Sequence, residues 1–270
     1  MPGGTSFYFS NAIRQMDVKF GLITSLAASE MRFANSLVAH GIDVLTLPSA
    51  HTVYFENIYS INLDHRTQRV LHTADPFTVD QLQQMEATIF HLGPLLADDI
   101  SIGVIKMLAL KGKVSLDVQG YLRAVKNKQV VPVDWINKME ALPYIEILKV
   151  NEMEMEVLTG SADIKVAARL LNQWGAEEVV ITLGSKGSVV FTNDTFYAIP
   201  AYRPDRLVDA TGCGDTYMAG YLYKRIKGCN PQQAGEFAAA MASIKISAPG
   251  PFVGKEEDVL NLITYREKLV

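Results

Sequence analysis

Seven short apolar runs are spread along the chain, and they constrain its fold more than any other feature. Many of them have the continuous apolar character that is typical of strands buried on both faces of a sheet. Helical patterns lie between several of them, at residues 29–40, 100–110 and 163–174. Strands that alternate with helices predict an α/β fold, with a mainly parallel sheet covered by helices on both faces. The expected strands are residues 20–26, 42–47, 88–92, 113–118, 145–150, 179–183 and 188–192.

Length and charge set limits on the class of protein. The chain has 270 residues, enough for a large core, and we expect a single domain over residues 1–270. A net charge of −4 predicts no basic surface for nucleic acid or an anionic membrane, and no apolar run is long enough to span a bilayer. The two cysteines, Cys213 and Cys229, do not make a disulfide framework. These features predict a cytoplasmic protein.

Residues 209–215, with the sequence Asp-Ala-Thr-Gly-Cys-Gly-Asp, form the most informative motif. Its two glycines stand directly before a predicted helix that closes at Gly228. Backbone N–H groups in such a turn converge on one point, where the helix N-terminus favours an anion such as a phosphate in transfer. Asp215, in the first helical turn, is well placed to accept a proton from an attacking hydroxyl. The plainer alternative is that Asp209 and Asp215 only cap the helix and the glycines only make a tight turn.

This motif resembles the C-terminal motif of the ribokinase/PfkB carbohydrate kinase family. Three further segments match the family in order: Asn151 to Glu154 resembles its Asn-x-x-Glu motif, residues 181–187 its turn at the nucleotide phosphates, and Gly3-Gly4 with Asn11 the segment against the sugar. The resemblance covers essentially the whole chain. It implies a ribokinase-like three-layer αβα sandwich and an ATP-dependent kinase that phosphorylates a hydroxyl of a sugar or polyol.

The resemblance also implies roles for individual residues. Asp215 would be the general base. The anion hole would be formed by Gly212, Cys213 and Gly214. Hydrated Mg²⁺ would be organised by Asn151 and, more directly, Glu154. ATP would be bordered by Thr182, Gly184, Ser185 and Gly187, with Ala239 and Ser243 near the adenine. Asp209 and Thr211 match positions that bind a monovalent cation, usually K⁺, in some members.

The acceptor is less sharply predicted. Asp117, Gln119 and Arg123 follow a strand at the place where sugar kinases of this family hold polar contacts, although a strand end that only faces solvent explains them equally well. Together with Gly3-Gly4 and residues 52–56, this segment looks closer to the myo-inositol kinase-like branch than to ribokinase. A nucleoside kinase of the same family is the nearest alternative. A non-catalytic nucleotide- or sugar-binding protein is another, although binding alone needs no base at Asp215.

One stretch breaks the alternation of strands and helices. Residues 52–60 and 66–73 are β-rich and residues 61–65 suit a turn, which predicts a hairpin. Its apolar residues alternate imperfectly, so it is either an edge of the main sheet or a separate flap. We favour a β lid at about residues 51–74, because a closing lid keeps water from a reactive phosphate. By analogy, this lid would also join two copies of the chain as a homodimer.

The sequence departs from the family at two positions. The family has a first strand with a substrate-gripping Asp before the Gly-Gly segment, whereas Met1 stands two residues before Gly3. We therefore expect this strand to be missing, either through clipping of the start or because the protein lacks it and binds substrate weakly. Cys213 replaces the usual Ala. It is interpreted as a small space-filling residue, the alternative being an oxidisable thiol whose pKa is lowered by the helix N-terminus.

Overall fold

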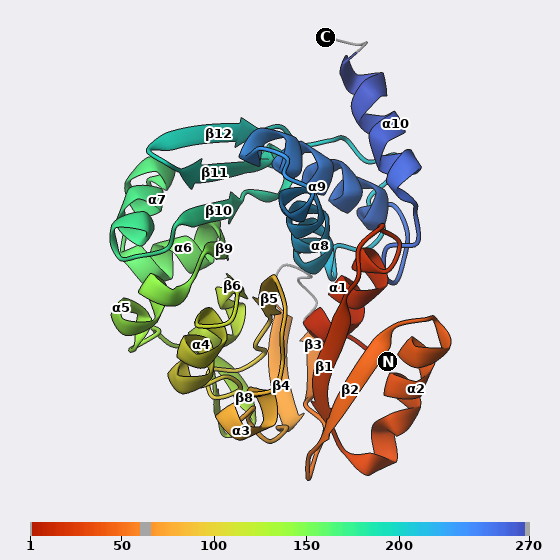
Figure 1. Cartoon of the computed structure of the whole chain (residues 1–270), viewed down its shortest axis with the longest axis vertical. Helices are drawn as coiled ribbons and strands as arrows, with labels where there is room; N and C mark the ends of the chain where they lie inside the picture. Colours follow the sequence, from red (N-terminus) through yellow and green to blue (C-terminus); the bar gives the residue numbers. More distant parts are fainter. Residues whose placement is uncertain (1, 60–65, 268–270) are drawn as a thin grey trace.

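The structure, a computed structural model, describes residues 2–59 and 66–267. Its centre is a six-stranded sheet in the order β12-β11-β10-β9-β6-β5 (Figure 1). Parallel pairing joins β5 (Ile89–Leu92), β6 (Lys113–Asp117), β9 (Ile147–Asn151) and β10 (Glu178–Thr182). The antiparallel strands β11 (Ser188–Thr192) and β12 (Thr195–Ile199) complete one edge. This is the mainly parallel α/β sheet that the apolar runs predict.

Helices cover both faces of this sheet, and each face has its own apolar core. The first core is closed by α4 (Ile102–Ala109), α5 (Lys138–Ala141), α6 (Glu152–Thr159) and α7 (Ile164–Gln173). The second is closed by α1 (Gly4–Ile13), α8 (Cys213–Ile226), α9 (Pro231–Ile246) and α10 (Glu256–Glu267). Because side chains alternate along β9, Leu148 and Val150 enter the first core while Ile147 enters the second. Lys149 therefore faces the side of α1 and α8.

Two of the predicted strands do not join the central sheet. β1 (Gly21–Leu26) and β2 (Asp43–Pro48) pair with each other in a parallel two-stranded sheet, connected by η1 (Ala28–Glu30) and α2 (Met31–Ala39). In Figure 1 this unit lies beside α1, at one side of the molecule. Within residues 2–59 and 66–267, α1 is the first element and no strand precedes it. The sequence pattern does not predict the helix over residues 4–13.

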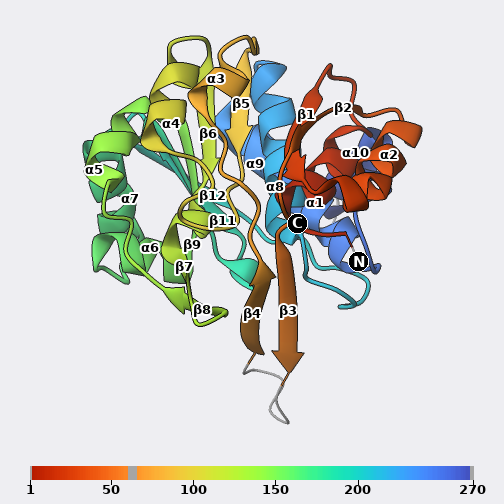
Figure 2. The same cartoon turned by 90° about the horizontal axis from the view of Figure 1, so that it is seen from below.

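The predicted hairpin belongs to a separate antiparallel sheet, so it is a flap and not an edge of the main sheet. The sheet has the order β3-β4-β8-β7, with β3 (Tyr54–Tyr59), β4 (Arg66–His72), β7 (Arg123–Lys126) and β8 (Gln129–Pro132). Figure 2 shows β3 and β4 projecting from the body of the molecule. The predicted turn at residues 61–65 lies outside the described residues. The second hairpin turns at Asn127 and Lys128, both with positive φ, as a tight two-residue hairpin requires.

The helix signals in the last third of the chain are confirmed. Asn230 caps α9 through a reciprocal capping box with Gln233, and Pro231 occupies the first helical position. The remaining short elements are α3 (Val79–Leu82), η2 (Val118–Leu122), η3 (Leu142–Tyr144) and η4 (Gly184–Lys186). Among the described helices, none combines the length and apolar character needed to cross a membrane.

Candidate active site

The carboxyl ends of the central strands bring the predicted motifs to one edge of the sheet. In the parallel register, Asp117 of β6 lies opposite Lys149 of β9, and Asn151 of β9 lies opposite Thr182 of β10. Open α/β sheets bind their ligands at this edge. The N-terminus of α8 reaches the same place, since a Cβ on Gly214 would lie 3.3 Å from the Lys149 ammonium. Three motifs that are far apart in the sequence therefore meet here.

The predicted anion hole is built on a left-handed glycine. Gly212 is the N-cap of α8 with φ of 75°, and a Cβ at this position would lie 2.1 Å from the buried ring of Tyr8. Both the backbone conformation and the contact therefore require glycine. The Cys213 amide donates to the carbonyl of Ala210 at 3.2 Å. The amides of Gly214 and Asp215 follow in the first turn of α8, where a helix has no partners of its own for its N–H groups.

Asp215 is partly buried beside this turn. Burial, together with the negative charge of Asp117, raises the pKa of the Asp215 carboxyl to about 6. A hydrogen bond from Thr5 and the ammonium of Lys149 act in the opposite direction. A carboxyl with this pKa is ionised at neutral pH and is a stronger proton acceptor than an exposed aspartate. In this position the carboxylate can accept a proton from a group bound next to the first turn of α8.

Lys149 connects the three motifs, although sequence reasoning missed it. Its side chain is buried, and its Nζ donates to Asp117 Oδ2 at 2.9 Å and lies 3.9 Å from Glu154 Oε2. The ammonium also acts on Asp215, as noted above. The signal in the sequence is a lysine inside the otherwise mainly apolar run 145–150, which also contains Glu146. Its meaning depended on the neighbours of β9, which the sequence does not show.

Asn151 and Glu154 form a capping box at the start of α6. The Asn151 Oδ1 accepts from the Glu154 amide at 2.9 Å, and Glu154 Oε2 accepts from the Asn151 amide at 2.8 Å. Burial raises the pKa of Glu154, with the ammonium of Lys149 opposing it. The described residues contain no group of three or more metal-ligating side chains. Mg²⁺ in kinases is held by one or two carboxylates plus waters and substrate phosphates, so Glu154 fits the ion that the family uses.

The residues predicted to border the donor lie at the end of β10, in the turn that follows it, and on α9. Thr182 ends β10, and the exposed Gly184 and Ser185 form η4 directly after it. Gly187 follows with φ of 95° and so close to the Ile199 carbonyl that a Cβ would lie 2.1 Å from it. Ala239 and Ser243 are buried on α9. The intervening part of α9 faces the anion hole, because the Ala242 carbonyl lies 4.0 Å from the Cys213 sulfur.

The residues predicted to contact the acceptor include the start of α1, which packs against the turn after β5. Gly3 is the N-cap of α1 and Gly4, with φ of 70°, lies against Leu95. Thr5, which sequence reasoning also missed, contacts Gly93 so closely that a Cβ there would lie 2.3 Å from it. On the far side of this turn Gly120 is pressed against Pro94 in the same way. The segment that carries the hydrogen-bond donor to Asp215 is thus fixed by glycine contacts.

The remaining predicted acceptor residues differ in their surroundings. Asp117 is buried and engaged, with Lys149 on one oxygen and the amide of Gln119 on the other. Arg123 starts β7 of the lid, and its charge acts on Glu154. Asn11 is 4% exposed and bonded within α1, donating to the Phe7 carbonyl at 2.9 Å. The structure thus places Asp117, Gln119 and Arg123 near the site. The side-chain amide of Asn11 is instead hydrogen-bonded within its own helix.

The two residues matched to a cation, and the cysteine, complete the site. Thr211 donates its amide to Asp209 Oδ1 at 2.9 Å, and the buried Lys245 binds the same aspartate. Burial raises the pKa of the Cys213 thiol to about 11. The thiol is therefore neutral at physiological pH, which agrees with a space-filling role and not with a reactive thiolate.

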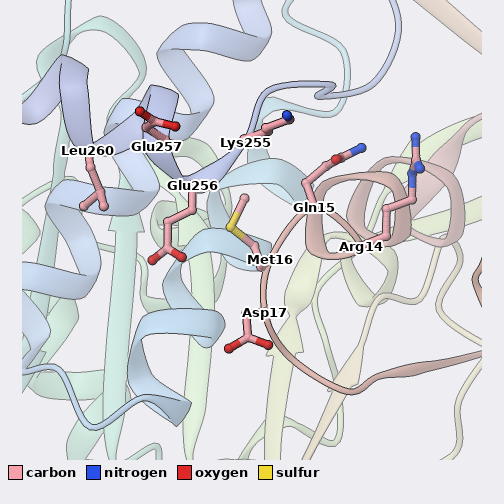
Figure 3. Close-up of a pocket in the computed structure, with 8 residues that line it drawn as sticks. All are labelled: Arg14, Gln15, Met16, Asp17, Lys255, Glu256, Glu257 and Leu260. Atoms are coloured by element: carbon pink, nitrogen blue, oxygen red, sulfur yellow. The ribbon is translucent and has the colours of Figure 1, made fainter.

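A separate hollow, of about 620 Å³, lies between the end of α1 and the start of α10 (Figure 3). None of the predicted site residues lines it. Of its three acidic residues, Glu256 is already paired with Lys224 at 2.6 Å and with the Tyr223 hydroxyl at 2.8 Å. The hollow is lined by Arg14, Gln15, Met16, Asp17, Lys255, Glu256, Glu257 and Leu260.

Comparison with known proteins decides the family. The pfkB family of carbohydrate kinases matches residues 111–257, which include β6, the Asn151–Glu154 motif and the anion hole. The chain belongs to the pfkB carbohydrate kinase family. It is thus a phosphotransferase of ribokinase-like fold, as the resemblance implies.

Similar proteins include kinases of different acceptors. A cytidine kinase of Thermococcus kodakarensis is 30% identical over 236 residues, covering 82% of this chain and 79% of its own length. A pyrophosphate-dependent kinase in the ribokinase family superposes with a TM-score of 0.85 at 30% identity, covering 96% of this chain and 91% of its own. A variant of a pyrophosphate-dependent myo-inositol-1 kinase superposes with a TM-score of 0.86 at 30% identity, covering 98% of this chain and 91% of its own.

Proposed function

We propose that this pfkB-family protein transfers the γ-phosphoryl group of ATP to a hydroxyl of a sugar or polyol, with Asp215 as the general base. The observation that carries the proposal is the position of Asp215. It lies in the first turn of α8, beside a left-handed glycine turn, and has a pKa near 6. A protein that only binds a nucleotide gains nothing from a basic carboxylate beside its anion site.

In this mechanism the acceptor hydroxyl approaches Asp215 from the side of Thr5 and Gly4. Asp215 takes the hydroxyl proton as the oxygen attacks the terminal phosphorus of the donor. The bond from that phosphorus to its bridging oxygen breaks, and ADP leaves with the electron pair of that bond. The amides of Gly214 and Asp215 and the dipole of α8 stabilise the charge on the transferred group. Phosphoryl transfer depends mainly on such positioning and charge stabilisation. Mg²⁺, held through Glu154 and Asn151, would neutralise the phosphates of the donor.

The polar residues around the proposed base support a polyol or sugar as the acceptor. Asp117, Gln119 and Arg123 lie in or next to η2, between the strand ends and the lid, where they would bind the hydroxyls of a small polyol. The likeness to the myo-inositol kinase variant over 98% of the chain supports a cyclic polyol. The likeness to a cytidine kinase over 82% keeps a nucleoside as the second candidate.

The donor has a second candidate as well. ATP agrees with the family, and Thr182, Gly184, Ser185 and Gly187 are the residues that would border it, with Ala239 and Ser243 near the adenine. The two similar structures described above are both pyrophosphate-dependent kinases. Pyrophosphate needs the anion hole and Mg²⁺ but no adenine contact. The two donors therefore differ in whether Ala239 and Ser243 take part.

A panel of donors and acceptors tests the proposal. The purified protein is incubated with ATP or pyrophosphate and with myo-inositol, ribose, fructose, 2-keto-3-deoxygluconate or cytidine, and phosphorylated product is measured by mass spectrometry. We expect product with a polyol or sugar. Product from cytidine and from no other acceptor would show that the acceptor is a nucleoside and not a polyol or sugar. If the protein binds ATP but gives no product with any acceptor, the proposed kinase activity is wrong and a nucleotide-binding protein is favoured.

A further inference from the structure

A buried cation fixes the segment that leads into the anion hole. Lys245 lies in the last turn of α9 and is 2% exposed. Its Nζ donates to the main-chain carbonyl of Asp209 at 2.6 Å and lies 3.2 Å from Asp209 Oδ2. The same ammonium lies over the ring of Tyr8, 5.6 Å from its centroid. Tyr8 is the residue on which Gly212 rests, so Lys245 supports the turn from two sides.

These contacts use the oxygens that a monovalent cation would need. Asp209 and Thr211 are the residues matched to K⁺ by the family resemblance. All three oxygens of Asp209 are engaged, the carbonyl and Oδ2 by Lys245 and Oδ1 by the Thr211 amide at 2.9 Å. A K⁺ ion on Asp209 would also lie next to a buried ammonium, and two like charges repel strongly away from water. The residues therefore do not fit a K⁺ ion.

The geometry points to Lys245 as a built-in monovalent cation that replaces K⁺ in the loop before the anion hole. An ammonium has nearly the size of K⁺ and binds the same kind of oxygen ligands. Because this cation is part of the chain, the loop keeps its shape at any salt composition.

The first test uses the unchanged protein and compares KCl with NaCl and tetramethylammonium chloride at equal ionic strength. The melting temperature, which needs no substrate, is expected to be the same in all three salts, since a ligand stabilises only a fold that binds it. Kinase activity, which rests on the proposed function, is expected to differ by less than about twofold. A K⁺-specific rise in melting temperature, or strong activation by K⁺, would overturn the inference.

The second test removes the ammonium with Lys245→Ala. We expect a lower melting temperature and a rate reduced by roughly tenfold in NaCl, both partly restored by KCl or NH₄Cl because the vacated oxygens then bind a free cation. Lys224→Ala is the matched control: Lys224 is also largely buried and ion-paired, to Glu256 of α10. This control should lose stability without responding to K⁺. A Lys245→Ala protein that folds but ignores K⁺ contradicts the inference, and one that does not fold leaves the decision to the unchanged protein.

Discussion

At the scale of single residues, the pKa of Asp215 gives the proposed reaction its pH dependence. Its value of about 6 results from burial and the charge of Asp117. The base works only when it is deprotonated, a form that predominates above its pKa and is lost as the pH falls. We predict that kcat/KM is constant above pH 7 and falls about tenfold per unit below pH 6. A profile that stays flat down to pH 5 would contradict this role.

Thr5 supplies a control for that profile. Its hydrogen bond lowers the pKa of Asp215, and Thr5→Val removes the hydroxyl with little change in shape. The acid limb of kcat/KM should therefore move to higher pH in Thr5→Val. An unchanged limb would mean that another group sets it.

Lys149 is the residue on which the buried charges depend. Both Lys149 and Asp117 are less than a tenth exposed, so Lys149→Met leaves Asp117 buried without its cation. Loss of one partner of a buried ion pair costs about 3–5 kcal/mol, which we predict as the loss in the free energy of unfolding measured with urea. Lys111→Met, which removes the more exposed pair with Glu86, is expected to cost less than about 1 kcal/mol. Equal losses in the two variants would refute the central place of Lys149.

At the scale of elements, the N-terminus of α8 depends on Gly212. Gly228, after the C-terminus of the same helix, is the matched control position. Gly212 and Gly228 both have positive φ, of 75° and 82°, but only Gly212 rests on Tyr8. We predict that Gly228→Ala costs about 1–2 kcal/mol of stability from conformation alone. Gly212→Ala should add a further ~1–3 kcal/mol by displacing the Tyr8 ring and should abolish the anion hole. Similar activities in the two variants would argue against the anion hole.

The sequence predicts elements well where the pattern is local. Five apolar runs form strands of the central sheet, most of them buried along nearly their whole length, and the capping box of Asn230 is a signal confined to four residues. The helix at Gly4–Ile13 and the β7–β8 hairpin were missed. Both are short and depend on partners elsewhere, α8 for the helix and β4 for the hairpin.

At the scale of the whole molecule, the lid sheet has an edge strand that suits the proposed homodimer. β3 is one of the two edge strands in the order β3-β4-β8-β7, and Tyr54 on it is 53% exposed. Exposed edges readily pair with another chain. We predict a dimer in sedimentation velocity that shifts to monomer in Tyr54→Asp. A monomer at all concentrations would exclude this interface.

The site as a whole was half predictable. Motif order predicts that Asp215, Glu154 and Gly212 lie near one another. The structure brings them to one edge of the sheet, because α8 packs against Lys149 at the end of β9. Lys149, Lys245 and Thr5 could not be assigned in the same way, because each acts through a contact between elements distant in sequence. Buried cations in particular resemble surface residues until the strands and helices around them are known.

The most direct test of the account is the turnover of Asp215→Asn with the donor and acceptor that the panel identifies. The amide keeps the size of the side chain but cannot accept the hydroxyl proton. We predict a fall in kcat of at least about 100-fold, with donor affinity in calorimetry close to that of the unchanged protein. Turnover within a few-fold of the unchanged protein would show that Asp215 is not the base.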